Sequence, residues 1–129
     1  MQLRISCGLL ALVVLASTIQ LGCGRGRRAV SADPDAARTA LGQALDAWKA
    51  GETPDAFRTR AAITVVDEQW QKGTRLVGYE LLGNGAKDGF DWQCKVRLAV
   101  QDSGGKKSEH KGTYNVSTAP KVVIVRGES

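Results

Sequence analysis

The chain has 129 residues, of which 18 are lysine or arginine and 13 are aspartate or glutamate, giving a formal net charge of +5. Four of the arginines precede Asp33, so the chain from Asp33 onward carries 14 basic and 13 acidic residues. A basic protein is a candidate for nucleic-acid binding. Here the excess charge lies outside the part expected to fold, which excludes a nucleic-acid partner.

The first 22 residues have the pattern of a secretory signal peptide. Arg4 gives the positive start, and residues 5–19 form a mostly apolar run. That run is shorter than the roughly 20 apolar residues of a membrane-spanning helix and has the length of a signal-peptide core. We therefore expect an exported protein whose residues 1–22 are a signal peptide.

Gly22 and Cys23 follow this leader. A small residue before a cysteine at this point resembles the lipobox of bacterial lipoproteins, where the thiol receives a diacylglycerol and the leader is cleaved just before it. The resemblance implies lipidation of Cys23 and a membrane-anchored protein of the cell envelope, with its domain in the periplasm or outside. The usual lipobox has Leu and a small residue where this chain has Gln20 and Leu21. An ordinary secreted protein, or an uncleaved anchor, is the alternative.

Residues 23–32, "CGRGRRAVSA", are expected to form a lipid-anchored basic tether whose arginines can lie against anionic headgroups. Residues 33–129 are then expected to form one domain. Cys94 is the single cysteine of this domain, so it has no internal disulfide unless Cys23 stays unmodified. The domain must therefore rely on its hydrophobic core.

Two helices are predicted at the start of the domain. Asp33 can cap the first one with Pro34 behind it, and Gly51 ends it. A second, short helix begins after Thr53, with Phe57 as its buried residue. The apolar residues of the first helix fall at three- and four-residue spacings; they are Ala37, Leu41, Ala44, Leu45 and Trp48.

The signal is mixed over residues 61–76, where β-branched "AITVV" precedes "DEQWQKG", a helical turn with Trp70 facing inward. "RLVGYELLG" is then predicted as a strand. Residues 83–89, "GNGAKDG", are predicted as a hairpin turn. They lack the Walker spacing and the following helix of a phosphate-binding loop.

The clearest strand lies in "GFDWQCKVRLAVQD", and "SEHKGTYNVST" and "KVVIVRG" provide two more. The predicted fold class is α+β, with the N-terminal helix and the short second helix packed on a curled antiparallel sheet of three to four strands. Alternate residues of the clearest strand are expected to face the core; they are Phe90, Trp92, Cys94, Val96, Leu98 and Val100.

This order of elements, with "LDAWKAGETPDAF" and "VVDEQWQKGTRLVGYEL", resembles the cystatin-like or nuclear-transport-factor-two-like superfamily of α+β rolls. That superfamily includes ketosteroid isomerase, scytalone dehydratase and many pocket-bearing domains. The resemblance covers residues 33–126. It implies a concave side that holds a small apolar ligand or an outer sheet face that docks a second copy. No catalytic residue is carried over, and the cystatin inhibitor signature Gln-x-Val-x-Gly is absent.

A thiol nucleophile would have to combine Cys94 with His110, the one histidine. If the apolar faces of their two strands coincide, the residues lie four or more positions apart, roughly 13 Å. That separation is beyond the reach of a nucleophile and its base, so Cys94 is predicted to be a small core residue. One histidine without a ligand cluster predicts no metal site, and no motif calls for a cofactor.

The candidate pocket-lining residues are Tyr79, Trp92, Tyr114 and His110. Isomerase chemistry needs a base beside them, but Asp91 falls on the opposite strand face, and no inward carboxylate is expected. The preferred hypothesis is a non-enzymatic binding or interaction module of the cell envelope, with a small apolar ligand or a second copy as partner. A small pocket enzyme of the isomerase or dehydratase kind, or a purely structural envelope protein, is the alternative.

Overall fold

The computed structural model describes residues 30–127, so the predicted signal peptide, Cys23 and the arginines of the tether lie outside the described residues. Two helices come first, and five strands with one short helix follow. In chain order the elements are α1 (Pro34–Lys49), α2 (Pro54–Ala61), β1 (Ile63–Val66), α3 (Glu68–Gln71), β2 (Arg75–Asp88), β3 (Asp91–Gln101), β4 (Lys107–Ser117) and β5 (Val122–Gly127).

Both predicted helices are present, with the predicted caps. The Asp33 carboxylate accepts a hydrogen bond from the backbone N–H of Asp35 at 3.0 Å, and Thr53 Oγ1 accepts one from Ala56 at 3.1 Å. These side chains satisfy N–H groups that a helix start leaves without partners. The predicted apolar stripe of α1 is buried, and so is Phe57 of α2.

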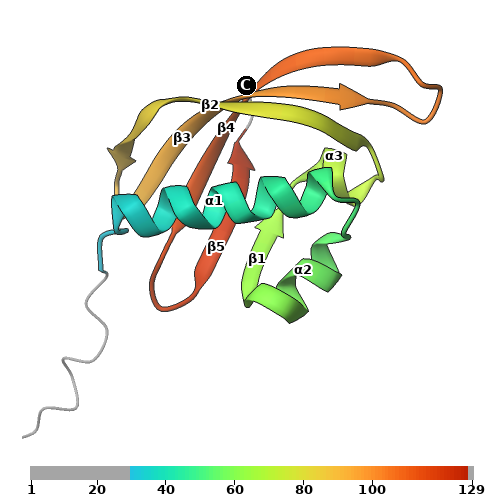
Figure 1. Ribbon diagram of the computed structural model, residues 1–129. Coiled ribbons are helices and arrows are strands. Elements are labelled where there is room, and N and C mark those ends of the chain that lie inside the picture. Colours follow the sequence, from blue (N-terminus) through green and yellow to red (C-terminus); the bar gives the residue numbers. More distant parts are fainter. Residues whose placement is uncertain (1–29, 128–129) are drawn as a thin grey trace, which may run out of the picture.

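The five strands form one sheet in the order β1-β5-β4-β3-β2, and α1 lies across one of its faces (Figure 1). The α+β class is confirmed, while the sheet has five strands rather than three to four and is mixed rather than antiparallel. The added strand is β1, which pairs in parallel with β5. A four-residue strand is too short to show alternation, and its distant partner leaves no local trace in the sequence.

The segment predicted as one hairpin turn has two parts. The pairing of β2 with β3 shifts between Leu82 and Ala86, so the first glycines belong to a bulge inside β2. The turn itself follows Asp88, which pairs with Asp91. Phe90 lies in this turn and is 59 % exposed, so its predicted place in the core is wrong. A two-residue turn interrupts the strand periodicity on which that prediction relied.

The core lies between α1 and the covered face of the sheet. Cys94, Val96, Leu98 and Val100 of β3 are buried, as alternation predicts, and Trp92 is partly buried. Trp70 of α3 is buried too and stacks on Trp48 of α1, with ring centroids 5.8 Å apart and planes 15° from parallel. The long elements thus place one apolar layer between helix and sheet.

Candidate functional site

A buried carboxylate lies where α3 meets the sheet. Asp67 is 1 % exposed and precedes α3, and its side chain accepts hydrogen bonds from the backbone of Gln69 at 3.0 Å and of Trp70 at 3.4 Å. The hydroxyl of Tyr114, also buried, donates to Asp67 Oδ2 at 2.6 Å. Asp67 therefore caps a helix and binds a strand with the same carboxylate.

The charge of Asp67 has a partner on β5. Arg126 Nη1 lies 3.3 Å from Asp67 Oδ1 and also donates a hydrogen bond to Gln69 Oε1. The Arg126 side chain is 16 % exposed, so the pair is largely shielded from water. A buried charge is tolerated when an opposite charge and hydrogen bonds compensate its lost solvation. Asp67, Tyr114 and Arg126 form what we call the Asp67 network.

The Asp67 network contradicts one expectation, because an inward carboxylate does lie beside Tyr114. Its contacts define its chemistry: Oδ1 of Asp67 accepts three hydrogen bonds, from two backbone N–H groups and Arg126, and Oδ2 accepts one, from Tyr114. Burial, followed by the negative charge of Asp67, raises the pKa of Tyr114. A carboxylate that binds a helix start and two strands, beside a tyrosine that keeps its proton, favours a structural clamp over a proton-transfer pair.

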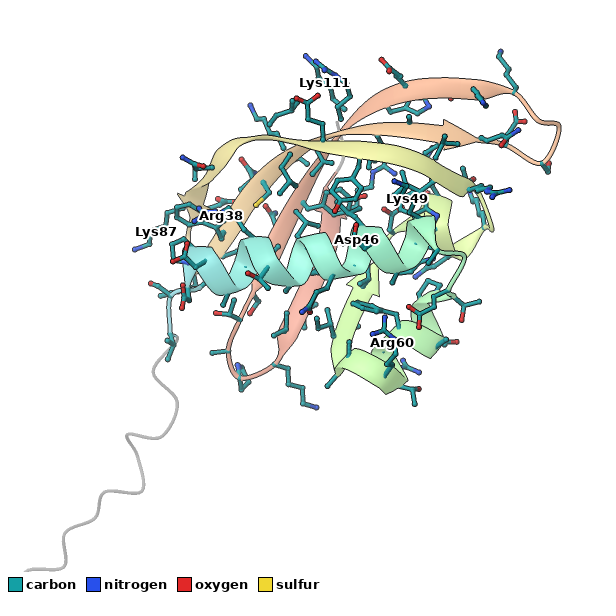
Figure 2. The ribbon with its side chains drawn as sticks, viewed as in Figure 1. Arg38, Asp46, Lys49, Arg60, Lys87 and Lys111 are labelled. Carbon is teal, nitrogen blue, oxygen red and sulfur yellow. The ribbon has the colours of Figure 1, made fainter. Side chains whose placement is uncertain are left out.

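Tyr79 also has a carboxylate partner that strand parity does not reveal. Its hydroxyl donates to Asp46 Oδ1 of α1 at 2.7 Å. Burial first, and then the hydrogen bond to Asp46, raises the pKa of Tyr79 to about 12. Asp46 is exposed on the face of α1 seen in Figure 2. This pair fastens α1 to β2 at the rim of the core.

Trp92, the third candidate, donates from its indole Nε1 to the backbone oxygen of Asn84 at 2.9 Å. It thereby joins β3 to the bulge of β2. His110, the fourth, is exposed, and its Nε2 lies 2.9 Å from Ser108 Oγ. β5 ends opposite Thr113, so β4 is flanked by β3 alone at His110 within the described chain. Each of the four candidates thus has its own hydrogen-bond partner, and no hydrogen bond joins any two of them within residues 30–127.

The strand register shows how far apart Cys94 and His110 lie, and thus whether they could act as a nucleophile and its base. Cys94 pairs with Tyr114 and His110 pairs with Leu98, the register expected from matching the apolar faces. The predicted separation of four or more positions between Cys94 and His110 is confirmed, and the register sets it at four. The Cys94 thiol is buried, and burial raises its pKa, which keeps it protonated and unreactive. Cys94 is a core residue.

Surface depressions occur elsewhere. One depression, of about 290 Å³, lies where α1 ends and α2 begins, and Trp48 and Trp70 form part of its wall. Another, of about 330 Å³, lies where β2 begins. Two of about 540 Å³ flank α2. None of these four includes Tyr79, Trp92, Tyr114 or His110 in its lining.

The sheet face turned away from α1 carries exposed side chains of several kinds. Val66 of β1 and Val125 of β5 are register partners, and they are 45 % and 40 % exposed. Lys111 lies on this side as well, pointing away from α1 (Figure 2). We call this surface the outer face; its members alternate along the strands with core residues and include Thr64, Val66, Glu80, Lys95, Arg97, Glu109, Lys111, Asn115, Val123 and Val125.

Within residues 30–127, no group of three or more His, Cys, Asp or Glu side chains is placed to hold a metal ion, and no helix there has the length and apolar character to cross a bilayer. Comparison with protein-family models, with curated proteins and with solved structures finds no significant match.

Proposed function

We propose that this chain is an exported lipoprotein of the cell envelope, anchored through Cys23, and that its α+β domain is a non-enzymatic interaction module. Its partner is a second copy of the same chain, bound through the outer face. The likeness to pocket-bearing rolls belongs to the same proposal, since such rolls pair through the exposed side of the sheet. The leader and Gly22-Cys23 support the anchor.

The hydrogen bonding of the buried polar side chains favours a function at the surface of the domain. Every buried side-chain nitrogen or oxygen among residues 30–127 has a hydrogen-bond partner. The Asp67 network uses its polar atoms on α3, β4 and β5, and Tyr79 uses its hydroxyl on α1. Groups with such partners would have to break a stabilising contact before they could act on a ligand.

The observation that carries the proposal is the pairing of Val66 with Val125. These are two of the few large apolar side chains that stay exposed in the described chain, and the register places them side by side on the outer face. Half-buried Thr64 and Val123 flank them on the same strands. Covering such a surface stabilises association by about 25 cal/mol per Å² of apolar area removed from water.

The charges of the outer face suit a second copy. Glu109 and Lys111 lie on β4, and Arg97 on β3 bonds Glu80 on β2 at 3.1 Å. In a two-fold interface each patch meets its own copy, so a face with both signs can pair its own acids with its own cations. A face of one sign would repel itself.

Sedimentation and native mass spectrometry of the full chain in a mild non-ionic detergent test this proposal. We expect a dimer, and we expect Val125→Glu to convert it to a monomer because a carboxylate would enter the centre of the interface. Thr39→Glu, an exposed residue of α1, is the matched control and should leave the dimer intact.

A wild-type chain that stays monomeric at high concentration would exclude the second copy as partner. A bound mass that disappears on denaturation would instead support the pocket-enzyme alternative or a small-ligand carrier, and its identity would separate those two. Circular dichroism of Val125→Glu is needed beside the sedimentation result, because loss of the dimer counts only if the variant is folded.

A further inference from the structure

Three cations from different elements gather where α1 ends. The depression of about 330 Å³ at the start of β2 is lined by Lys49, Arg75, Leu76, Val77, Gln101 and Lys107. Lys49 is the last residue of α1, Arg75 the first of β2 and Lys107 the first of β4. Figure 2 shows Lys49 at that end of the helix. No lining residue is acidic.

The sheet register builds one wall of the depression. Arg75 pairs with Gln101 across β2 and β3, and Gln101 pairs with Lys107 across β3 and β4. Neighbouring strands lie about 4.8 Å apart, so the backbones of Arg75 and Lys107 are separated by roughly 10 Å. By strand alternation Arg75 and Lys107 share the parity of the sheet face turned away from α1, and the depression at this end of the sheet is lined by both of them together with Lys49.

These cations are not neutralised by the described part of the chain. Lys49, Arg75 and Lys107 form no ion pair within residues 30–127, unlike Arg97 and Arg126.

Among the described residues, the nearest carboxylates along the chain form no ion pair with these cations. Asp46 accepts from Tyr79 and Asp102 Oδ1 accepts from the backbone of Lys106 at 2.9 Å, while Glu109 lies two residues beyond Lys107 on the same face of β4. Three positive charges lining one depression repel one another, and a bound anion would relieve that repulsion.

We propose that this depression binds a phosphate group. The guanidinium of Arg75 offers a planar pair of donors that matches two phosphate oxygens, and the ammonium groups of Lys49 and Lys107 add point charges. Three cations suit the double negative charge of phosphate better than the single charge of a carboxylate. The inference gives the interaction module a ligand class, but it involves neither Cys23 nor the outer valines and can be tested separately.

The place of the depression favours a free phosphate-bearing molecule over the anchoring membrane. The chain enters α1 beside the β2–β3 and β4–β5 turns, where the N–H of Ala32 bonds the Phe90 oxygen and the N–H of Asp33 bonds Thr118 Oγ1. α1 then runs 16 residues, about 24 Å, before reaching Lys49. The described chain therefore begins at the opposite end of the domain from the depression.

The test is a titration of the ¹⁵N-labelled full chain in non-ionic detergent with inorganic phosphate, at constant ionic strength against chloride. We expect saturable shifts of the amides of Arg75, Val77 and Gln101 that chloride does not reproduce. The double variant Arg75→Gln/Lys107→Gln should bind at least about tenfold more weakly. The control Lys87→Gln/Lys121→Gln removes two exposed lysines elsewhere and should bind like the wild type.

Shifts that chloride reproduces, or a double variant that binds phosphate like the wild type, would overturn the proposal. If the double variant does not give a folded spectrum, Lys49→Gln replaces it, with an expected loss of about threefold. A parallel titration with glycerophosphoglycerol, a soluble phospholipid headgroup, identifies the source: preference for inorganic phosphate supports a free ligand, and preference for the headgroup supports a lipid. Phosphate binding by monomeric Val125→Glu would separate this site from the dimer.

Discussion

Tyr114 donates a hydrogen bond of 2.6 Å to Asp67, 47 residues earlier in the chain, and both side chains are buried. The bond connects the cap of α3 to the middle of β4, and Arg126 of β5 completes the contact. Three segments distant in sequence thus meet on one carboxylate. The loop between β1 and β2 depends on this contact for its position.

Removing the Tyr114 hydroxyl should therefore weaken the fold. We expect Tyr114→Phe to lower the free energy of unfolding by about 1–3 kcal/mol, because a buried charged acceptor loses a donor that water cannot replace. Urea unfolding followed by tryptophan fluorescence measures this loss. Tyr79→Phe is the matched control, since its bond reaches the exposed Asp46, and its loss should be smaller. Equal losses would mean that Asp67 is not the decisive partner.

The chain has two tyrosines, and both resist ionisation in the folded state. The pKa of Tyr79 is raised from 10.0 to about 12, and that of Tyr114 is raised as well. Since the folded state holds these protons more tightly, their contribution to stability is complete below pH 10 and decreases as pH rises above 10, and that of Tyr79 is lost as the pH passes about 12.

We therefore expect unfolding at alkaline pH, with the rise of tyrosinate absorbance coinciding with loss of the folded circular dichroism signal. The variant Tyr79→Phe/Tyr114→Phe should be less stable at neutral pH but should lose less stability over that pH interval. Tyrosinate absorbance that develops fully near pH 10 in the folded protein would contradict this prediction.

Gly85 lies in the β2 bulge with φ +85°, and a Cβ there would be 2.6 Å from the Gln93 backbone oxygen. Gly85→Ala should destabilise the protein by at least about 1–3 kcal/mol, because both the dihedral angle and the contact oppose a side chain. Gly42→Ala in α1 meets no atom within 4 Å and should stabilise by about 0.5–1 kcal/mol. Thermal unfolding of the two variants should shift in opposite directions, and a shift in the same direction would contradict this account.

Local signals were enough to predict α1. Its cap at Asp33, the proline behind it and the spacing from Ala37 to Trp48 all act within one segment, and each is present in the structure. The buried face of β3 from Cys94 to Val100 followed from alternation alone. Matching the buried faces also limited the register of β3 with β4 to two pairings, with Cys94 opposite Tyr114 or Val116, and the structure has the first.

The remaining features depend on contacts between distant residues. Asp67 could be recognised as a helix cap beside "EQWQ", but its burial follows from Tyr114 and Arg126, which only the folded sheet brings near. The depression lined by Lys49, Arg75 and Lys107 also depends on distant contacts, since the pairing of β2, β3 and β4 brings Arg75 and Lys107 together. The alternation of side chains along a strand also could not show that Asp46 of α1 accepts a hydrogen bond from Tyr79 of β2.

Replacing Cys23 is expected to change whether the protein is found on the membrane. If its thiol carries the lipid, Cys23→Ser should move the protein from the membrane fraction to the released fraction, because each buried lipid methylene contributes about 0.8 kcal/mol to attachment. Cys7→Ser is the matched control: Cys7 lies in the expected leader, which is cleaved away, so this change should alter neither fractionation nor mature mass. Fractionation followed by intact-mass measurement, with a diacylglycerol-sized difference between wild type and Cys23→Ser, checks both points. A Cys23→Ser protein that stays on the membrane would point to an uncleaved leader as the anchor, in which case the domain would still lie beside the membrane but the lipoprotein proposal would be wrong.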